Sequence, residues 1–332
     1  MLPSTFAFAR LPMRFLRLSL FPLVVALLAF PGALRAAIIA DLLTKIQQSE
    51  FVFPKSESNA PFVPVAWVNA TFYSDSSVNL KTGRVQFKVW SESQALMAPV
   101  WVGKKDMVIA GEYGSWQQIK ISAPNPSQLN ITTIIPVLAW ARQIDPKMQG
   151  AVFVAPNFVN GGKFNGYSLK QTTVYSGLVA FRWNSDRFAW GGGVINYRSD
   201  GSALWLPYVG ALWRPAKEFS VALVLPWPSL SYAPTPHTLY TLGLAPAGAT
   251  LGGSRDGQKL TVGFSSWNLM VSVHRQLTKS LWLSAGAGRS GFGSFTVSSN
   301  GDPGLKHELD RGPVFSLQLS VRPPTAAPSV AK

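Results

Sequence analysis

The stretch GPVFSLQLSVRP, near the C-terminus, alternates between apolar and polar side chains along its whole length. Its apolar positions are Phe315, Leu317, Leu319 and Val321, and Ser316, Gln318 and Ser320 lie between them. A period of two belongs to a β-strand, whose successive side chains point to opposite faces. The pattern predicts a strand with one apolar and one polar face, and it leaves open whether the apolar face meets a protein core or lipid.

Segments of similar pattern, separated by turn sequences, follow one another over residues 63–322. GRVQFKVWSES and TTVYSGLVAFRWNSD are two examples. No apolar run in this region reaches the length of a transmembrane helix, so a chain that enters a membrane here must cross it as strands. The sequence predicts an all-β fold, an antiparallel transmembrane β-barrel over residues 63–322 with about 12 strands, in a range of about 10–14.

The two ends of the chain differ from this pattern. Residues 1–36 carry basic residues, then a short apolar stretch, then small residues, as in a secretory signal peptide. Residues 37–62 combine apolar positions at helical spacing with a Pro-rich connector, and residues 323–332 form a Pro/Ala-rich tail. Many outer-membrane barrels end on an aromatic residue, and this chain does not. Export by the signal peptide and a barrel fold together predict the bacterial outer membrane.

Aromatic residues gather near segment ends. Trp and Tyr favour membrane–water boundaries because their rings are apolar while their N–H or O–H groups need water. We expect an interfacial girdle formed by Trp90, Trp140, Trp183, Trp190, Tyr197, Trp205, Trp213, Trp227, Tyr232 and Trp282. The alternative is a soluble β-sandwich, which would have to explain why only 14% of the residues are charged, against about 25% in typical soluble domains.

The net charge of +15 falls to +11 when residues 1–36 are removed. Arg84, Lys88 and Arg182 lie on the polar faces of their predicted strands, and His274 joins them. These four residues are the candidate lumen lining, and inward-facing cations would favour anions. Alternatively, the basic excess at strand ends and loops contacts lipid phosphates, including those of lipopolysaccharide. The charge is not concentrated and no recognition motif accompanies it, so nucleic-acid binding is not predicted.

Candidate catalytic chemistry is sparse. The three histidines are far apart in sequence, and the chain has no cysteine, so neither a metal site nor a cofactor is predicted. The segment GAGRSG satisfies G-x-G-x-x-G, but the residues after it read as a strand, where a dinucleotide site needs a helix. The sequence therefore predicts no enzyme. A membrane lipid hydrolase is the weakest alternative, because the expected position of His274 is in the lumen.

Residues 187–248 resemble a family of bacterial outer-membrane-type β-barrels known only as a domain of unknown function. The resemblance rests on Trp190 and Gly191, on the strand with Pro207, Gly210, Trp213 and Pro215, on Pro226, Pro228, Ser231 and Tyr232, and on Leu242, Gly243 and Leu244. It implies an exported barrel and no particular activity.

Two functions remain open at this point. The first is a passive, porin-like channel with a cationic lumen that passes small anionic solutes. The second is a structural or interaction barrel with a filled interior, whose protein partner the sequence does not identify. The scarcity of acidic residues favours the channel, whereas the glycine-rich strands favour the filled interior.

Overall fold

The structure is a computed structural model that describes residues 49–51, 58–74, 76–80, 83–121, 127–164, 167–199, 202–255, 257–299, 305–308 and 312–323. The chain divides into two units, Met1–Gln47 and Gln48–Lys332, and the described residues belong to the second. The expected signal peptide (1–36), the possible helix early in 37–62 and nearly all of the tail 323–332 lie outside the described residues. No helix among the described residues is long and apolar enough to cross a membrane.

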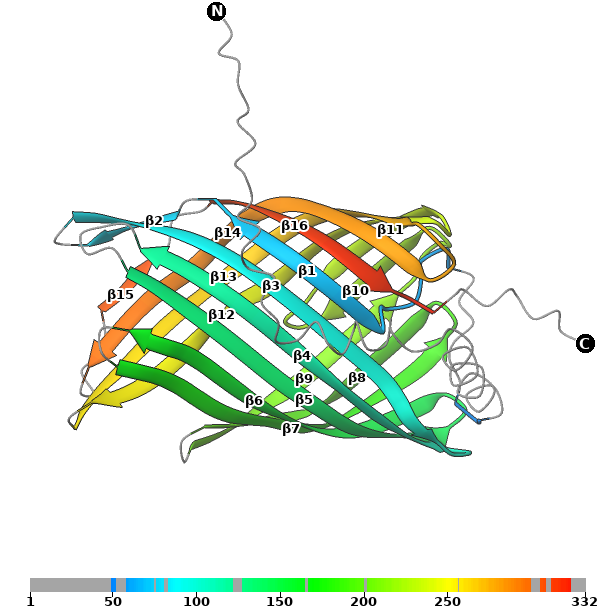
Figure 1. Cartoon of the computed structure of the whole chain (residues 1–332). Coiled ribbons are helices and arrows are strands. Elements are labelled where there is room, and N and C mark those ends of the chain that lie inside the picture. Colours follow the sequence, from blue (N-terminus) through cyan, green and yellow to red (C-terminus); the bar gives the residue numbers. More distant parts are fainter. Residues whose placement is uncertain are drawn as a thin grey trace, which may run out of the picture. The chain divides into compact units, whose positions relative to one another are not determined.

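The described residues of the second unit form β-strands joined by short turns (Figure 1). In chain order the strands are β1 Ala66–Tyr73, β2 Ser76–Leu80, β3 Gly83–Val102, β4 Asp106–Ile121, β5 Ser127–Asp145, β6 Met148–Phe164, β7 Tyr167–Ser185, β8 Phe188–Ser199, β9 Ser202–Trp213, β10 Phe219–Val224, β11 Ser229–Thr235, β12 Thr238–Arg255, β13 Gln258–Gln276, β14 Leu281–Ser299, β15 Leu305–Glu308 and β16 Gly312–Val321.

The sheet closes on itself because β1 pairs with both β3 and β16. β1 and β2 pair with successive parts of β3, so they count as one strand of the barrel. β15 and β16 likewise pair with successive parts of β14, in an unbroken register, and count as one strand. Across the described residues the result is a closed antiparallel barrel of 14 strands. The predicted fold class is confirmed, and the strand count lies at the top of the expected range.

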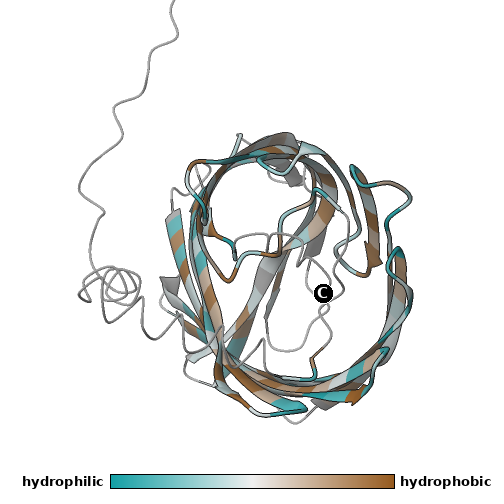
Figure 2. Ribbon diagram, turned by 90° about the vertical axis from the view of Figure 1, so that its right-hand side faces the viewer, coloured by the Kyte–Doolittle hydropathy of each residue, from teal (hydrophilic) through white to brown (hydrophobic). Residues whose placement is uncertain are grey.

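The apolar face of the closing strand points outward. In β16, Phe315, Leu317 and Leu319 are exposed, whereas Val314 and Ser320 of the opposite face are buried. In β5, Leu138 is 52% exposed, while Ile131 of the other face is 2% exposed and belongs to an interior core cluster. Figure 2 shows the strands in a ring, with hydrophobic and hydrophilic residues alternating along the ribbons. The apolar outer face is therefore exposed to the surroundings of the barrel.

The outer apolar band has the height of a membrane. In β5 the outer positions from Ile134 to Ile144 are apolar except for Arg142, near the strand's end. At about 3.3 Å per residue and a tilt of about 40°, this stretch rises about 25 Å, which is the height of the apolar band in outer-membrane barrels. The whole of β5 has 19 residues, so the strand continues beyond the band.

Beyond the band, the outward side chains of the strands are polar and the inward side chains are apolar. In β5, Gln128 and Asn130 are exposed outward, whereas Leu129 and Ile131 are buried inside. The interior core cluster consists of Val89, Ile119, Leu129, Ile131, Val159, Leu169, Leu251, Leu260, Val262 and Phe295. This end of the barrel, remote from Ala66 and Val321, is called the narrow end, and its interior is packed like that of a soluble protein. The opposite end, where β1 begins and β16 ends, is called the terminal end.

The narrow end forms because β8–β11 are short. They have 12, 12, 6 and 7 residues, whereas β7 has 19 and β12 has 18. Past the short strands, β7 and β12 meet directly, with Lys170 paired to Gly252. A Cβ atom on Gly253 would lie only 2.8 Å from the Ser168 carbonyl oxygen, so the glycine permits this approach. The barrel therefore has a wide ring of fourteen strands that narrows where β7 joins β12.

Candidate functional site

Part of the interior wall of the wide ring is neutral. One continuous ladder of paired inward positions crosses six strands and consists of Ile109, Ala139, Phe153, Gly177, Ile195 and Leu206. The Phe153 ring lies over Gly177, where a Cβ atom would be 2.8 Å from its Cε1. Small and apolar side chains therefore line the lumen along this ladder, which suits a neutral apolar solute better than an ion.

The strand register places Lys88 and Arg182, two of the four candidate lumen residues, on the outer face. Lys88 alternates with Val89, which belongs to the interior core, whereas the side chain of Arg84 lies outside the described part of the structure. Arg182 pairs with Trp190, whose side chain is 48% exposed on the outer face. The sequence expectation differs because it took the apolar face of each strand as the outer one. At the narrow end the apolar face points inward, and in β7 both faces carry apolar residues.

The side chain of His274 points into the barrel. Its ring contacts two hydroxyl groups, Nε2 with Thr241 Oγ1 at 3.0 Å and Nδ1 with Ser284 Oγ at 2.6 Å. Both ring nitrogens are thereby engaged with neutral partners. No group of three His, Cys, Asp or Glu side chains in the described part of the chain could hold a metal ion. His274 is therefore a polar residue of the interior whose two ring nitrogens both have hydrogen-bond partners.

The hydrogen-bonded wall of the barrel is interrupted between β9 and β12. β10 pairs with only Gly210–Trp213 of β9, and β11 reaches no further along β12 than Gly243. Both strands continue toward the narrow end, and among the described residues no strand pairs with residues 203–209 of β9 on the β10 side or with residues 245–251 of β12 on the β11 side. We call this interruption the wall gap. Its far limit is the Lys170–Gly252 pair.

Apolar side chains surround the wall gap. Leu204 and Leu206 point inward and are nevertheless 54% and 46% exposed. Trp205 and Val209 of the outer face of β9 are exposed too, as is Trp227 in the turn between β10 and β11. Exposed apolar side chains of β9 and of the β10–β11 turn therefore lie beside the wall gap.

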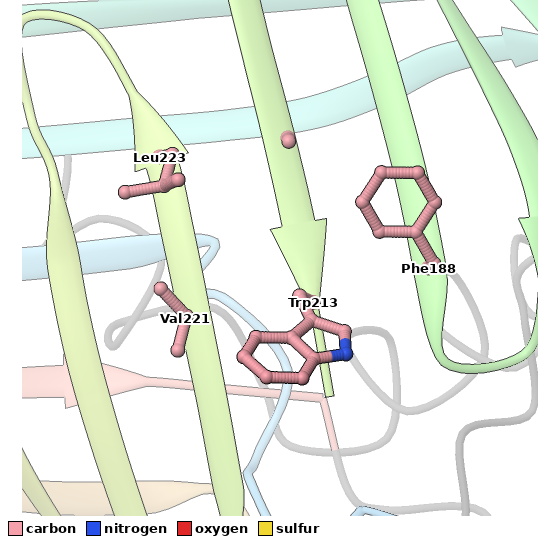
Figure 3. A pocket seen from close by; sticks show the side chains of 5 residues that line it. Phe188, Trp213, Val221 and Leu223 are labelled. Carbon is pink, nitrogen blue, oxygen red and sulfur yellow. The ribbon is translucent and has the colours of Figure 1, made fainter. Parts of the chain in front are cut away.

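A separate apolar hollow of about 290 Å³ lies on the outer face near the terminal end (Figure 3). It is lined by Phe188, Ala211, Trp213, Val221 and Leu223. In the ladders of β8, β9 and β10 these residues share the outward parity of Trp190 and Trp213. The hollow is open to the surroundings of the barrel and is not part of the lumen.

The expected aromatic girdle divides between the two faces. Trp140, Trp190, Trp205, Trp213 and Tyr232 are exposed on the outer face, with Trp227 exposed in its turn. Trp90 stacks on outward-facing Phe72, and Tyr232 stacks on Phe219 and Tyr240. The other three point inward. Tyr197 contacts Tyr175, Trp183 lies under the Arg214 guanidinium, and Trp282 is 2% exposed.

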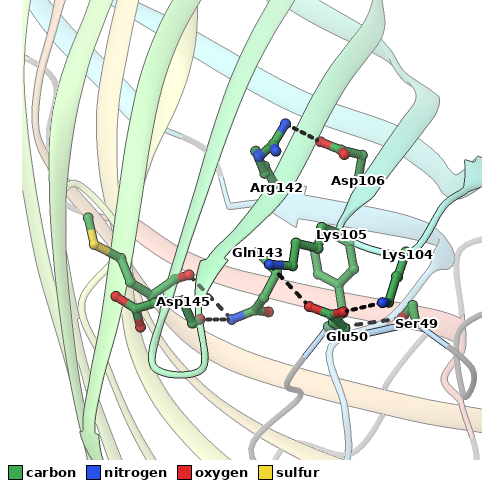
Figure 4. Close-up of polar contacts among 10 residues, drawn as sticks. Ser49, Glu50, Lys104, Lys105, Asp106, Arg142, Gln143 and Asp145 are labelled. Atoms are coloured by element: carbon green, nitrogen blue, oxygen red, sulfur yellow. Dashed lines mark hydrogen bonds and ion pairs between the residues drawn. The ribbon is translucent and has the colours of Figure 1, made fainter.

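Residues before the first strand are held against the terminal end. Glu50 forms ion pairs with Lys104 Nζ at 3.2 Å and Lys105 Nζ at 3.4 Å, and its N–H donates to the Lys104 carbonyl (Figure 4). The hydrogen bond from Lys104 lowers the pKa of the Glu50 carboxyl. Further along, the Asn59 N–H donates to the Lys217 carbonyl, and the Val65 N–H donates to the Val321 carbonyl. This segment therefore contacts the turns and strand ends around the terminal opening.

Sequence reasoning missed the wall gap and found only part of the lumen. The segment 218–234 reads as one strand, whereas it forms the short hairpin β10–β11 with its turn at Leu225–Pro228. The prolines Pro226 and Pro228 were the signal for that turn. The motif GAGRSG lies within β14. Arg322 directly follows the last strand and belongs to no sequence motif.

No family model and no curated protein matches the chain. Among solved structures it is similar to a FadL homologue of Pseudomonas aeruginosa, with 10% identity, 77% of this chain and 89% of that chain covered, and a TM-score of 0.44. It is also similar to the Pseudomonas putida toluene transporter TodX, with 9% identity, 77% of this chain and 88% of that chain covered, and a TM-score of 0.35. A third similar structure is the β-domain of the Bordetella autotransporter BrkA, with 10% identity, 77% of this chain and 98% of that chain covered, and a TM-score of 0.32. Similarity at this level carries no argument about function, and the barrel assignment rests on the strand register.

Proposed function

We propose that this protein is an outer-membrane β-barrel that binds small, neutral, apolar solutes in its lumen and passes them through the wall gap. The observation that carries the proposal is the neutral interior ladder that ends at Leu206, on the apolar rim of the gap. A solute that leaves water for such a surface gains about 25 cal/mol per Å² of apolar area buried. The lumen therefore favours hydrocarbon-like solutes over ions.

The position of the gap supports a route at the membrane surface. An open sheet edge is not tolerated in hydrocarbon, because its N–H and C=O groups would lack partners. Trp205 and Trp227, exposed at the rim, are residues of the type that gathers at membrane–water boundaries. The wall gap then lies at the edge of the hydrocarbon layer, where apolar solutes collect, and the lumen leads from it toward the terminal end.

The anion channel inferred from sequence has less support. Rings of inward cations select anions, and Lys88 and Arg182 occupy outer-face positions. A structural barrel with a filled interior is favoured by one observation, the apolar core of the narrow end. That core occupies one end only, so it is compatible with a solute site in the wide ring.

The proposal is tested by uptake of the neutral apolar dye N-phenyl-1-naphthylamine into Gram-negative cells that express the protein. Its fluorescence rises when it reaches phospholipid. We expect the wild type to speed this rise, and the double variant Leu204→Asp/Leu206→Asp to slow it at least about tenfold, because each carboxylate makes the rim costly for an apolar solute.

The matched control is Gln128→Asp/Asn130→Asp, which adds two carboxylates to the polar outer face of the narrow end. It should leave the rate unchanged. Equal uptake by cells with and without the folded wild-type barrel would rule out the proposed function.

A further inference from the structure

Arg322 is a buried cation at the terminal end of the lumen. It directly follows β16, and its backbone N–H donates to the Ser280 carbonyl at 2.8 Å. The residue is 6% exposed. Its Nη1 donates to the Phe62 carbonyl oxygen at 3.1 Å, and its guanidinium carbon lies 5.4 Å from the centre of the Trp282 ring. Among the described residues, no carboxylate forms an ion pair with it.

Two buried polar atoms in this region have no hydrogen-bond partner among the residues that the structure describes. One is Nε of Arg322, and the other is Oγ of Ser320, a residue that is 1% exposed. Burying a charge or a donor without a partner is costly, so such groups normally meet a counter-ion or an acceptor. The guanidinium presents its N–H groups as a planar fork that matches the two oxygens of a carboxylate.

The surroundings of these two residues are aromatic. Ser320 pairs with Trp67 on one side and with Trp282 on the other, so all three occupy inward positions of adjacent strands. Trp67 also contacts the ring of Tyr113. Beyond Trp282 on the same face lies Ser284, whose hydroxyl is engaged by His274. An unpaired cation is thus set among rings that would accept an apolar body.

From these contacts we infer that Arg322 and Ser320 bind the carboxylate of an apolar carboxylic acid, whose hydrocarbon body lies against Trp67 and Trp282. The inference rests on the proposed function, since the acid reaches the site through the apolar lumen. The carboxylate accepts a hydrogen bond from the Nε–H of Arg322, and a bond between two opposite charges is about twice as strong as one between neutral groups. Ser320 donates its hydroxyl to the second oxygen.

The test uses three probes with the same ring system: 2-naphthoate, its methyl ester and naphthalene. Binding to the full-length protein in lipid nanodiscs is measured by equilibrium dialysis, with empty nanodiscs as the blank. The wild type should bind 2-naphthoate at least about tenfold more tightly than the ester or naphthalene. Arg322→Gln should lose that preference while binding naphthalene within about twofold of the wild type, and Arg322→Lys should fall between the two.

The matched control is Arg289→Gln, which removes an exposed arginine from the outer face of β14 and should change none of the three affinities. Equal binding of naphthoate and its ester by the wild type would overturn the inference, even if Arg322→Gln fails to fold. Retention of the preference in folded Arg322→Gln would overturn it too. Failure of all three probes to bind would instead contradict the proposed function.

Discussion

Glycines at inward positions let neighbouring strands of the ring pack closely. In β8, a Cβ atom on Gly193 would lie 2.0 Å from the Leu178 carbonyl oxygen and 2.8 Å from Val179 Cα. The contact atoms belong to the backbone, which has little freedom to move away. The run Gly191–Gly193 indicates a bend or a close approach in the sequence alone, and the structure shows the close approach.

Gly193→Ala should therefore destabilise the barrel by about 1–3 kcal/mol, the usual cost of overpacking. The control is Gly263→Ala in β13, where an added Cβ would meet its nearest atoms at 3.6 and 3.8 Å, an ordinary contact. The free energy of unfolding, from urea titration in lipid vesicles, should fall for the first variant and stay within about 0.5 kcal/mol for the second. Equal values for the two variants would contradict the close packing.

At single positions, alternation predicts which side chains share a face but not which face is inside. His274 could be placed inside because its neighbours Leu269, Val271 and Val273 form an exposed apolar row. Arg182 could not be placed, because Phe181 and Trp183 beside it are also apolar and point into a lumen that is itself apolar. The rule that polar residues line the lumen fails where the lumen wall itself consists of apolar side chains.

A single strand can cross two environments, and β5 does so. Its outer face is polar at Gln128 and Asn130 and apolar from Ile134 onward, while its inner face is buried and apolar at Leu129. In β4, the glycines and the polar residues Gln117, Gln118 and Lys120 weaken the alternation. Ladder partners on β3 and β5 hold β4 in place, and such partners are not visible within the segment itself.

The reversal in β5 yields a prediction about one face of one strand. Leu138→Lys places a charge on the lipid face near the middle of the band and should cost about 2–4 kcal/mol of folding free energy. Asn130→Lys lies eight residues away on the same face, beyond the band, and should change the folding free energy by less than about 0.5 kcal/mol. Both values come from urea unfolding in vesicles. A similar loss of folding free energy in the two variants would show that the apolar band extends beyond Ile134 to Asn130.

At the scale of the whole barrel, the closed ring could be predicted from sequence, since the outer apolar faces need lipid and an open sheet edge cannot lie in it. The wall gap and the narrow end could not be predicted. They follow from differences in strand length between β7, β12 and the four strands between them, and from the approach of β7 to β12 at Gly252. A distant pairing of this kind leaves no periodic signal.

The core of the narrow end also limits the passage of ions through the barrel. A straight aqueous path along the barrel axis would have to pass the core cluster, where Leu169 and Leu251 are fully buried. The proposed outlet, the wall gap, has an apolar rim that is costly for a hydrated ion. We expect wild-type barrels in planar bilayers to show no sustained ion current, although heat-modifiability on gels confirms that they are folded. A steady, anion-selective current through those barrels would contradict both the closed narrow end and the neutral lumen, and it would restore the anion channel that the charge of the sequence suggests.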